Sequence, residues 1–192
     1  MTQAMQQAIL DFWFGPPDSA EYGTTRDAWF RKDAAFDAEI RRRFGAVIET
    51  ALEGSLADWT APRATLARVL VLDQFARNCY RDSARAFAGD AQAIAAATAA
   101  VDQGQDRELI PVERWFLYMP FVHAESPAAQ ARSLALFTRL AHESGLADPL
   151  VWAEKHAVII RRFGRYPHRN ASLGRVSTAE EIAFLGTQGS NF

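Results

Sequence analysis

This sequence of 192 residues lacks several common features. It contains a single cysteine, Cys79, so no disulfide bond can form within the chain. Its richest apolar run, WFLYMPFV, is eight residues long, whereas a membrane-spanning helix needs about 20 apolar residues. The first residues, MTQAMQQAILDFWFGPP, have neither the basic start nor the long apolar centre of a signal peptide. We therefore expect a cytoplasmic protein that does not associate with a membrane.

Acidic residues are absent from one long segment. Between Lys155 and Ala179 the chain carries six basic residues and no aspartate or glutamate, although its net charge at pH 7 is −2. The remainder must therefore carry a charge of −8. Because the basic segment is short and the rest of the surface is acidic, we do not expect the protein to bind nucleic acid.

Alternation typical of β-strands is nearly absent, while helix patterns are frequent. Apolar residues from Phe36 to Leu52 recur three or four positions apart, with Asp33 as a capping residue and an end near Gly54. We expect further helices at 3–13, 62–79, 90–103, 111–119, 127–143, 149–163 and 177–185.

Start and stop signals support the helices near the C-terminus. Ser126 and Asp148 each stand directly before a proline, a pair typical of helix starts. Gly145 and Gly164 follow the two helices, where glycine in a left-handed conformation commonly ends a helix. The sequence STAEE (177–181) has a glutamate three residues after its serine, which predicts a capping box at the start of the last helix.

The short connections between these helices determine the fold class that we predict. Connections of about three to eight residues favour antiparallel neighbours. We therefore expect an all-α fold of antiparallel helix hairpins, stacked in a tetratricopeptide-like or α-solenoid-like array, although the helix starts show no fixed period. With 49% apolar residues the chain can bury a core as one domain. We expect a helical domain over 1–185 and a frayed tail over 186–192.

Two charged residues lie on an apolar face of the predicted helix 62–79. At about 100° per residue, Asp73 and Arg77 point nearly the same way as Leu66, and their spacing of four residues lets them pair. A buried charge needs a partner. The pair is therefore either an internal ion pair that fixes packing or part of a cleft that holds a ligand.

Histidines supply candidate acid–base groups. Pro120 should interrupt the apolar helix that contains it, which places His123 and Glu125 in a connection beyond the helix. The two residues could form an acid–base pair or bind a metal. Alternatively, His123 bonds a carbonyl and Glu125 favours the positive end of the next helix. His156 lies on a face with Trp152, where a histidine is more often a satisfied core residue than a ligand.

The segment RRFGRYPHRN (161–170) concentrates arginine. Arg161 and Arg162 lie in the last turn of a predicted helix, where they favour its dipole. Arg165, Arg169 and Arg175 have no such local explanation. Because a planar guanidinium suits carboxylates and phosphates, either acids from elsewhere in the chain or an anionic ligand must neutralise these residues.

Four stretches together resemble the signature blocks of a known family: DFWFG (11–15), DQFARNCYR (73–81), YMPFVHAES (118–126) and RRFGRYPHRNASLGR (161–175). The chain is similar, over essentially its whole length, to the family of the domain of unknown function number 924. This resemblance implies an all-helical fold of the tetratricopeptide-like superfamily, found in bacteria and some eukaryotes, with no established activity.

Three residues depart from the blocks that the resemblance leads us to expect. Ala76 replaces a proline, Val122 a glutamate and Tyr166 a phenylalanine. The change at Val122 weakens an acid-rich metal site beside His123. The residues of these blocks that we expect to bind a ligand are Asp73, Arg77, Asn78, Tyr118, His123, His156, Arg162, Arg165, His168, Arg169 and Asn170.

The sequence leaves three functional interpretations open. The first is a helical binding module whose arginines and histidines line a pocket for a small anionic ligand or an acidic peptide terminus. The second is a hydrolase-type enzyme that uses His123, Glu125, His156 or His168 for acid–base chemistry, with or without a metal, although no nucleophile elbow, Walker loop or HExxH motif is present. In the third, the polar blocks only lock helices together. We expect no resident cofactor and no dedicated metal site, and the oligomeric state stays open.

Overall fold

The structure is a computed structural model, in which residues 2–187 are described. It is all-α, as the sequence predicts, and residues 2–187 contain no β-strand. Over this part of the chain the α-helices are α1 (Gln3–Phe14), α2 (Ala34–Leu52), α3 (Pro62–Val69), α4 (Ala76–Cys79), α5 (Asp90–Asp102), α6 (Pro111–His123), α7 (Pro127–Ser144), α8 (Asp148–Phe163) and α9 (Ala179–Leu185). A π-helical segment, η2 (Leu70–Phe75), joins α3 to α4, and short 3₁₀ turns occur at η1 (Asp27–Trp29), η3 (Ala84–Phe87), η4 (Gln105–Glu108) and η5 (Pro167–Arg169).

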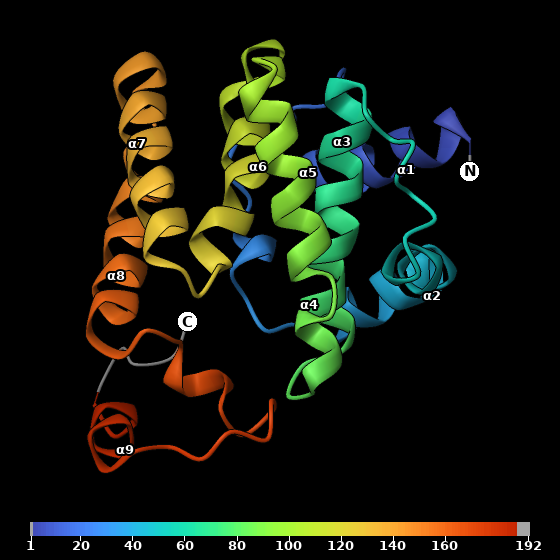
Figure 1. Cartoon of the computed structure of the whole chain (residues 1–192). Coiled ribbons are helices and arrows are strands. Elements are labelled where there is room, and N and C mark those ends of the chain that lie inside the picture. Colours follow the sequence, from blue (N-terminus) through green and yellow to red (C-terminus); the bar gives the residue numbers. More distant parts are fainter. Residues whose placement is uncertain (1, 188–192) are drawn as a thin grey trace.

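A row of packed helices, α3, α5, α6, α7 and α8, runs across the molecule (Figure 1). α3 packs on α5, α5 on α6, α6 on α7 and α7 on α8, while α1 and α2 cover the side of α3 and α4. The segment 164–178 leaves α8, passes below α6 and returns to α9 (Figure 1). From α5 to α8, helix neighbours in the sequence are thus neighbours in space, as short connections favour.

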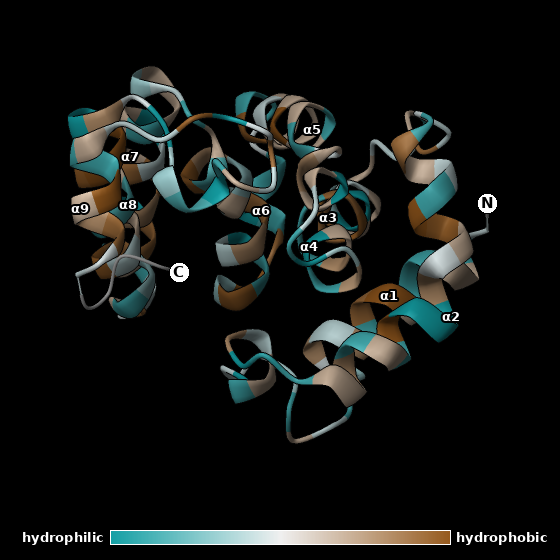
Figure 2. Cartoon of the chain, turned by 90° about the horizontal axis from the view of Figure 1, so that it is seen from below, coloured by the Kyte–Doolittle hydropathy of each residue, from teal (hydrophilic) through white to brown (hydrophobic). Residues whose placement is uncertain are grey.

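Two apolar clusters hold this arrangement together. Most helices carry hydrophobic and hydrophilic residues on different sides (Figure 2), so each buries one face against its neighbours. The main cluster contains Trp13 and Phe116, whose rings lie 5.3 Å apart. A smaller cluster joins Ile160 and Tyr166 to Phe184 of α9. This second cluster fixes the C-terminal segment against α8.

Several predicted helix ends are confirmed. Asp33 accepts hydrogen bonds from the N–H groups of the first turn of α2, at 2.8 and 3.1 Å. Ser126 accepts one from Ala129 at the start of α7. Gly145 and Gly164 end α7 and α8 with φ angles of 75° and 71°. Glycine adopts this left-handed conformation without the steric cost of a Cβ atom.

Two predicted helix starts are wrong by one residue. Thr178, not Ser177, caps α9. The Thr178 hydroxyl accepts a hydrogen bond from the Glu181 N–H, and the Glu181 carboxylate accepts one from the Thr178 N–H. The Ser177 hydroxyl instead accepts a hydrogen bond from Asn170. Asp148 does not cap α8 but is its first residue, after Ala147. At that position its carboxylate lies near the positive end of the helix.

The predicted break at Pro120 is also wrong, because α6 continues through this residue to His123. Proline removes one N–H donor from the helix. Phe121 and Val122 are both buried in the main cluster, so their packing offsets the lost hydrogen bond. His123 therefore lies in the last turn of a rigid helix rather than in a loop.

The ends of the chain add two observations. Of the tail predicted to fray, Gly186 and Thr187 are described, and Thr187 donates its N–H to the Phe184 carbonyl at 2.9 Å. Residues 188–192 lie outside the described part of the chain. Over residues 2–187, none of the helices combines the length and the apolar character that crossing a bilayer requires.

Candidate functional site

The polar blocks of the sequence meet at one end of the helix stack. Antiparallel neighbours bring the ends of α4, α6 and α8 and the starts of α5 and α7 to the same end (Figure 1). The segment 164–178 crosses this end. Blocks from residues 73–81, 118–126 and 161–175 therefore come together, as one ligand site would require.

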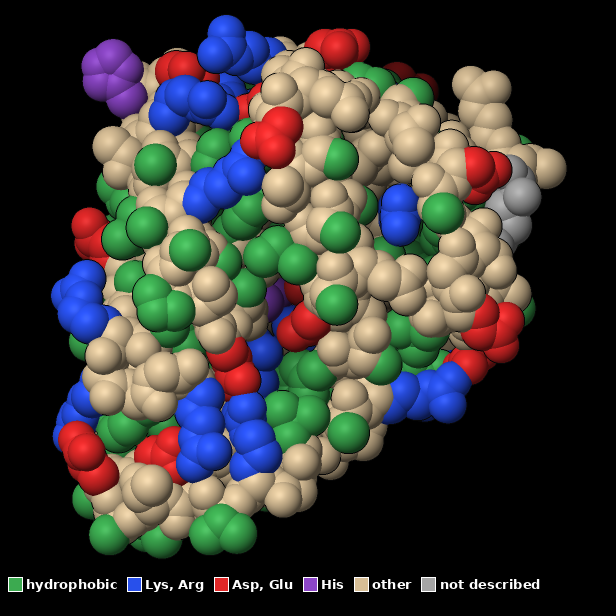
Figure 3. All heavy atoms as spheres, viewed as in Figure 1, with side chains coloured by type: hydrophobic (Ala, Val, Ile, Leu, Met, Phe, Trp, Pro, Cys, Tyr) green, Lys and Arg blue, Asp and Glu red, His purple; other side chains and the backbone are tan. Residues whose placement is uncertain are grey.

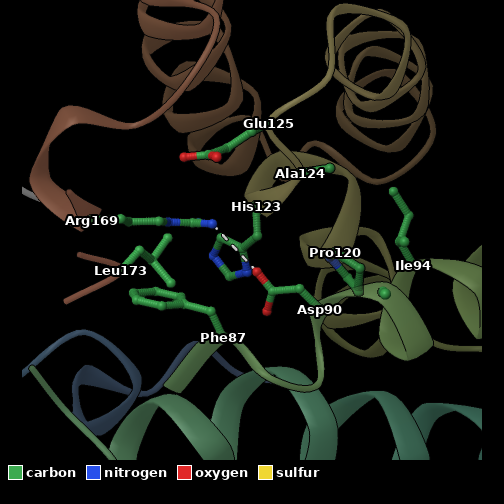
Figure 4. Close-up of a pocket in the computed structure, with 10 residues that line it drawn as sticks. Phe87, Asp90, Ile94, Pro120, His123, Ala124, Glu125, Arg169 and Leu173 are labelled. Atoms are coloured by element: carbon green, nitrogen blue, oxygen red, sulfur yellow. Dashed lines mark hydrogen bonds and ion pairs between the residues drawn. The ribbon is translucent and has the colours of Figure 1, made fainter. Parts of the chain in front are cut away.

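A cavity of about 350 Å³ lies at this end. Its walls come from the start of α5, the end of α6 and the segment after η5 (Figure 4). In the space-filling view, a histidine is visible within a hollow, with acidic and basic side chains close by (Figure 3). The residues that line the cavity are Phe87, Asp90, Ala91, Ile94, Pro120, His123, Ala124, Glu125, Arg169 and Leu173.

Asp73 and His123 form a hydrogen-bonded pair at the inner wall. Nδ1 of His123 lies 2.7 Å from Oδ1 of Asp73. Asp73 is fully buried, and its carboxylate also accepts from Gln74 at 2.6 Å and pairs with Arg77 at 3.0 Å. The predicted pairing of Asp73 with Arg77 is therefore confirmed. Asp73 itself does not line the cavity, but its partner His123 does.

The charges of this pair determine which nitrogen of His123 carries the proton. Burial raises the pKa of Asp73, but Arg77 and His123 outweigh it and hold that pKa well below its usual range. Burial and Arg77 lower the pKa of His123, although Asp73 opposes them. An ionised carboxylate can only accept, so Nδ1 donates and Nε2 of the neutral ring carries a lone pair.

An irregular helix and a glycine position these groups. Asp73 lies within the π-helical segment Leu70–Phe75, and π-helical turns often occur at functional sites. Gly89 packs directly on this segment, where a Cβ atom would lie 2.3 Å from the Leu72 carbonyl oxygen. Only glycine allows so close an approach. The contact places Asp90, the first residue of α5, beside Arg77.

Asp90 is shared between two arginines. Arg77 lies 2.8 Å from Oδ1 of Asp90 and donates to its Oδ2 at 3.0 Å. Arg169 reaches the same Oδ2 at 3.3 Å. The shorter distances belong to Arg77, so Asp90 neutralises Arg77 more effectively than Arg169.

Arg169 is buried between two aromatic rings. Its guanidinium carbon lies 4.7 Å from the centre of the Phe87 ring and 4.6 Å from that of Tyr166. Burial and the neighbouring Arg77 lower the pKa of Arg169 to about 10, although Asp90 opposes them. Within residues 2–187, Nε of Arg169 has no hydrogen-bond partner. The protein thus buries this cation without fully compensating its charge.

The pairing of His123 with Glu125, one of the two alternatives that the sequence leaves open, is not found. Both line the cavity, but Glu125 accepts from Arg175 at 2.6 and 2.9 Å and from the Tyr166 N–H at 2.8 Å. Burial raises the pKa of Glu125, but these donors outweigh it and hold it below the usual range. The charge of Arg175, fifty residues away, attracts Glu125 more strongly than a neutral histidine does. In residues 2–187 no three or more His, Cys, Asp or Glu side chains are grouped as metal ligands.

The other two candidate histidines do not line the cavity. Nδ1 of His156 bonds the Trp152 carbonyl at 2.8 Å, and the residue is 8% exposed, so the core interpretation of His156 is confirmed. Burial is the main cause that lowers the pKa of His156 to about 3 and that of His168 to about 4. Both rings are therefore neutral near pH 7.

Of the eleven predicted ligand residues, all within residues 2–187, His123 and Arg169 line the cavity and the other nine do not. Arg162 pairs with Glu180 at 2.8 Å, and Arg165 binds both carboxylate oxygens of Glu181 at 2.7 and 2.9 Å. Both arginines connect α8 and the residues after it to α9. Asn78 and Asn170 lie outside the cavity lining too, and the Asn170 side chain bonds Ser177, Glu181 and Arg175.

Tyr118 also lies elsewhere. It is fully buried, donates to Asp106 at 2.5 Å and accepts from Arg139 at 3.1 Å. This second polar cluster joins η4, α6 and α7 and does not reach the cavity. Tyr118 therefore fixes helix packing in this structure.

The sequence did not identify Phe87 and Asp90 as site residues. Both precede or begin α5, far from the arginine-rich segment that they contact. An aspartate in the first turn of a helix is common because it favours the dipole. No pattern in the sequence distinguishes Asp90 from such a residue, since its role depends on the packing of α5 against η2.

The comparisons with known proteins agree with this fold. Residues 9–189 match a family described as bacterial proteins of unknown function, DUF924. The solved structure of a protein of unknown function from Agrobacterium tumefaciens is similar, with 40% sequence identity, a TM-score of 0.83 and coverage of 97% of this chain and 99% of that chain. A search of curated proteins gave no match. The chain therefore belongs to the DUF924 family of bacterial proteins of unknown function.

Proposed function

We propose that the cavity binds a small molecule with an anionic group and that Arg169 holds this group. The poor bonding of a buried guanidinium carries the proposal. Arg169 is 5% exposed, yet within residues 2–187 the one hydrogen bond of its guanidinium to the protein is the 3.3 Å contact with Asp90. A carboxylate or phosphate in the cavity would accept from its remaining N–H groups.

Arg175, six residues after Arg169, shows how a structural arginine nearby in the sequence is bonded. It donates to Asn170 at 2.9 Å, to both oxygens of Glu125 at 2.6 and 2.9 Å, and to the Tyr166 carbonyl at 3.2 Å. The protein thus satisfies Arg175 along all three nitrogens. The contrast supports a ligand role for Arg169 and a structural role for Arg175.

The size and lining of the cavity favour a small molecule. Its volume of about 350 Å³ lies at the lower end of the range for ligand pockets. Phe87, Ile94 and Leu173 offer apolar contacts beside the charged groups. Of an acidic peptide, only a terminal residue would fit this volume. The stacked helices would act as a rigid scaffold, as in tetratricopeptide-like binding modules, and that likeness stays a prediction.

Binding of two probe anions tests the proposal. Phenylacetate and ethyl phosphate present a carboxylate and a phosphate, and we expect at least one to bind the parent protein in calorimetric titrations and to raise its melting temperature. Arg169→Gln should weaken this binding at least about tenfold, because a hydrogen bond to a charged group contributes about 1.5–3 kcal/mol and 1.4 kcal/mol is a factor of ten.

Arg162→Gln is the matched control. It removes the same charge from the same segment, but Arg162 is half exposed and pairs with Glu180. We expect this variant to bind the probes like the parent. Arg169→Lys keeps the charge and replaces Arg169→Gln if the latter does not fold. Failure of both probes to bind the parent, or unchanged binding by a folded Arg169 variant, would contradict the proposal.

A hydrolase-type enzyme, the second function expected from the sequence, stays a prediction. The pairing of Asp73 with His123 at the cavity favours it, because an oriented neutral imidazole is a common general base. A purely structural role fits Arg162, Arg165 and Arg175, each of which has its own carboxylate.

A further inference from the structure

The imidazole of His123 presents a hydrogen-bond acceptor to the cavity. Its Nδ1 donates to Asp73 at 2.7 Å, so the lone pair lies on Nε2. His123 lines the cavity together with Arg169 and Asp90 (Figure 4). Over the described part of the chain, no protein group bonds Nε2. A ligand with only an anionic group has no hydrogen-bond donor for this lone pair, whereas a ligand that also carries a hydroxyl group has one.

We infer that His123 is the general base of this cavity and takes a proton from a hydroxyl group adjacent to the anionic group of the ligand. The inference rests on the proposed function, because Arg169 must hold the anionic group for the hydroxyl to reach Nε2. The ligand class is a small hydroxy acid or a small phosphate ester with a neighbouring hydroxyl. The two share the same chemistry.

The proton transfer is balanced without another reactant. The O–H bond of the ligand breaks, its electron pair stays on the oxygen, and an N–H bond forms at Nε2. The ring then carries a positive charge, which the Asp73 carboxylate stabilises at 2.7 Å. Arg169, on the same cavity, stabilises the negative charge that develops on the ligand. Asp73 acts only through His123 and is a positioning residue.

The charges around His123 couple this step to ligand binding. Cationic groups close to the ring oppose its protonation in the empty cavity. A bound anion would offset the charge of Arg169, so the ring becomes a stronger base when the ligand arrives. The titratable and charged groups that face His123 come from η2, α4, α5, the connection after α6, α8 and η5: Asp73, Arg77, Asp90, Glu125, His156, His168 and Arg169.

The other acid–base candidates are less suited to this role. Glu125 is already bound by Arg175 and the Tyr166 N–H. His156 and His168 do not line the cavity. His123 is thus the histidine that the described structure places at the cavity wall, on a rigid helix.

Matched ligand pairs test the inference. Mandelate differs from phenylacetate, and 2-hydroxyethyl phosphate from ethyl phosphate, by one hydroxyl group each. Titration calorimetry near pH 7 gives the affinity of each probe. We expect the parent to bind the hydroxylated member of one pair at least about tenfold more tightly, because its hydroxyl group donates to Nε2. Binding of mandelate and phenylacetate would indicate a carboxylate ligand, and binding of the two phosphates a phosphate ligand.

His123→Gln should lose most of the preference for the hydroxyl, yet still bind phenylacetate or ethyl phosphate. His142→Gln removes an exposed histidine of α7 and should behave like the parent. If the parent binds both members of a pair equally, the inference is wrong and the proposed function stands. If the parent binds none of the four probes, both are wrong.

NMR of the parent protein gives an independent answer where His123→Gln does not fold. Labelled ring nitrogens should show His123 with its proton on Nδ1 in the free protein. Its titration should move to higher pH when the bound member of the pair is added. A free protein with the proton on Nε2, or a titration that does not move, overturns the inference.

Discussion

The buried histidines predict that mild acid destabilises the protein. His156 is 8% exposed, and burial, which outweighs the bond to the Trp152 carbonyl, lowers its pKa to about 3. In an unfolded chain the pKa of histidine is about 6.5. Below pH 6.5, His156 therefore binds a proton in the unfolded state, whereas in the folded state it stays neutral until the pH approaches 3. This contribution to the free energy of unfolding is fully present above pH 6.5 and is lost as the pH falls from 6.5 toward 3.

The expected loss follows from this difference in pKa. Each pH unit of the window costs about 1.4 kcal/mol, so His156 alone should lower the free energy of unfolding by about 2 kcal/mol between pH 6.5 and 5. His168, whose pKa burial lowers to about 4, adds a loss in the same direction. Carboxylates of the unfolded chain titrate near pH 4, so they contribute little in this range.

Urea unfolding of three proteins between pH 7.5 and 5 measures this loss. His156→Gln should reduce the pH dependence by about 2 kcal/mol relative to the parent. His142→Gln, at an exposed position, is the control and should keep the dependence of the parent. A folded His156→Gln variant that loses as much stability as the parent over this range would refute the conclusion that His156 is buried in its neutral form.

Two further predictions concern the inner wall of the site. Asp73→Ala removes one of the two carboxylates that pair with the buried Arg77 guanidinium, and we expect a loss of about 3–5 kcal/mol in urea unfolding. Asp27→Ala, which breaks an exposed pair, should cost less than about 1 kcal/mol, and equal losses would contradict the burial of Asp73. Gly89→Ala places a Cβ atom 2.3 Å from the Leu72 carbonyl oxygen and should cost at least about 1–3 kcal/mol. Gly45→Ala, where the new Cβ meets ordinary contacts in α2, should instead stabilise by about 0.5–1 kcal/mol, and a similar gain at Gly89 would show that the close approach does not exist.

The features that the sequence predicts correctly are those with local causes. Asp33 caps α2 through N–H groups two and three residues away. Gly145 and Gly164 end helices because of their own backbone conformation. Asp73 and Arg77 meet because four residues separate them on one helical segment. In each case the interacting groups lie within one turn, so sequence spacing is sufficient evidence.

The features that the sequence does not predict depend on packing between distant segments. Sequence spacing alone suggests that Glu125 can meet His123, but Arg175, fifty residues away, binds the Glu125 carboxylate instead. Asp90 meets Arg169 across 79 residues, only because α5 packs on the π-helical segment. The continuation of α6 through Pro120 likewise reflects burial of Phe121 in the main cluster. Long-range electrostatics and packing outweigh local preference at each of these positions.

The arginine-rich segment also explains why one cation remains available for a ligand. Three of its arginines each meet a separate carboxylate, in the pairs Arg162 with Glu180, Arg165 with Glu181, and Arg175 with Glu125. The absence of acids from residues 155–179 is thus mostly balanced by acids from other parts of the chain.

Arg169 is different, because it shares Asp90 with Arg77, which lies closer to that carboxylate. Arg77 also pairs with Asp73, whereas within residues 2–187 the one ion pair of Arg169 is the longer contact with Asp90. The Arg169 side chain is 6% exposed, so bulk water compensates it poorly. An anion in the adjacent cavity would supply the missing negative charge without displacing any ion pair of the protein.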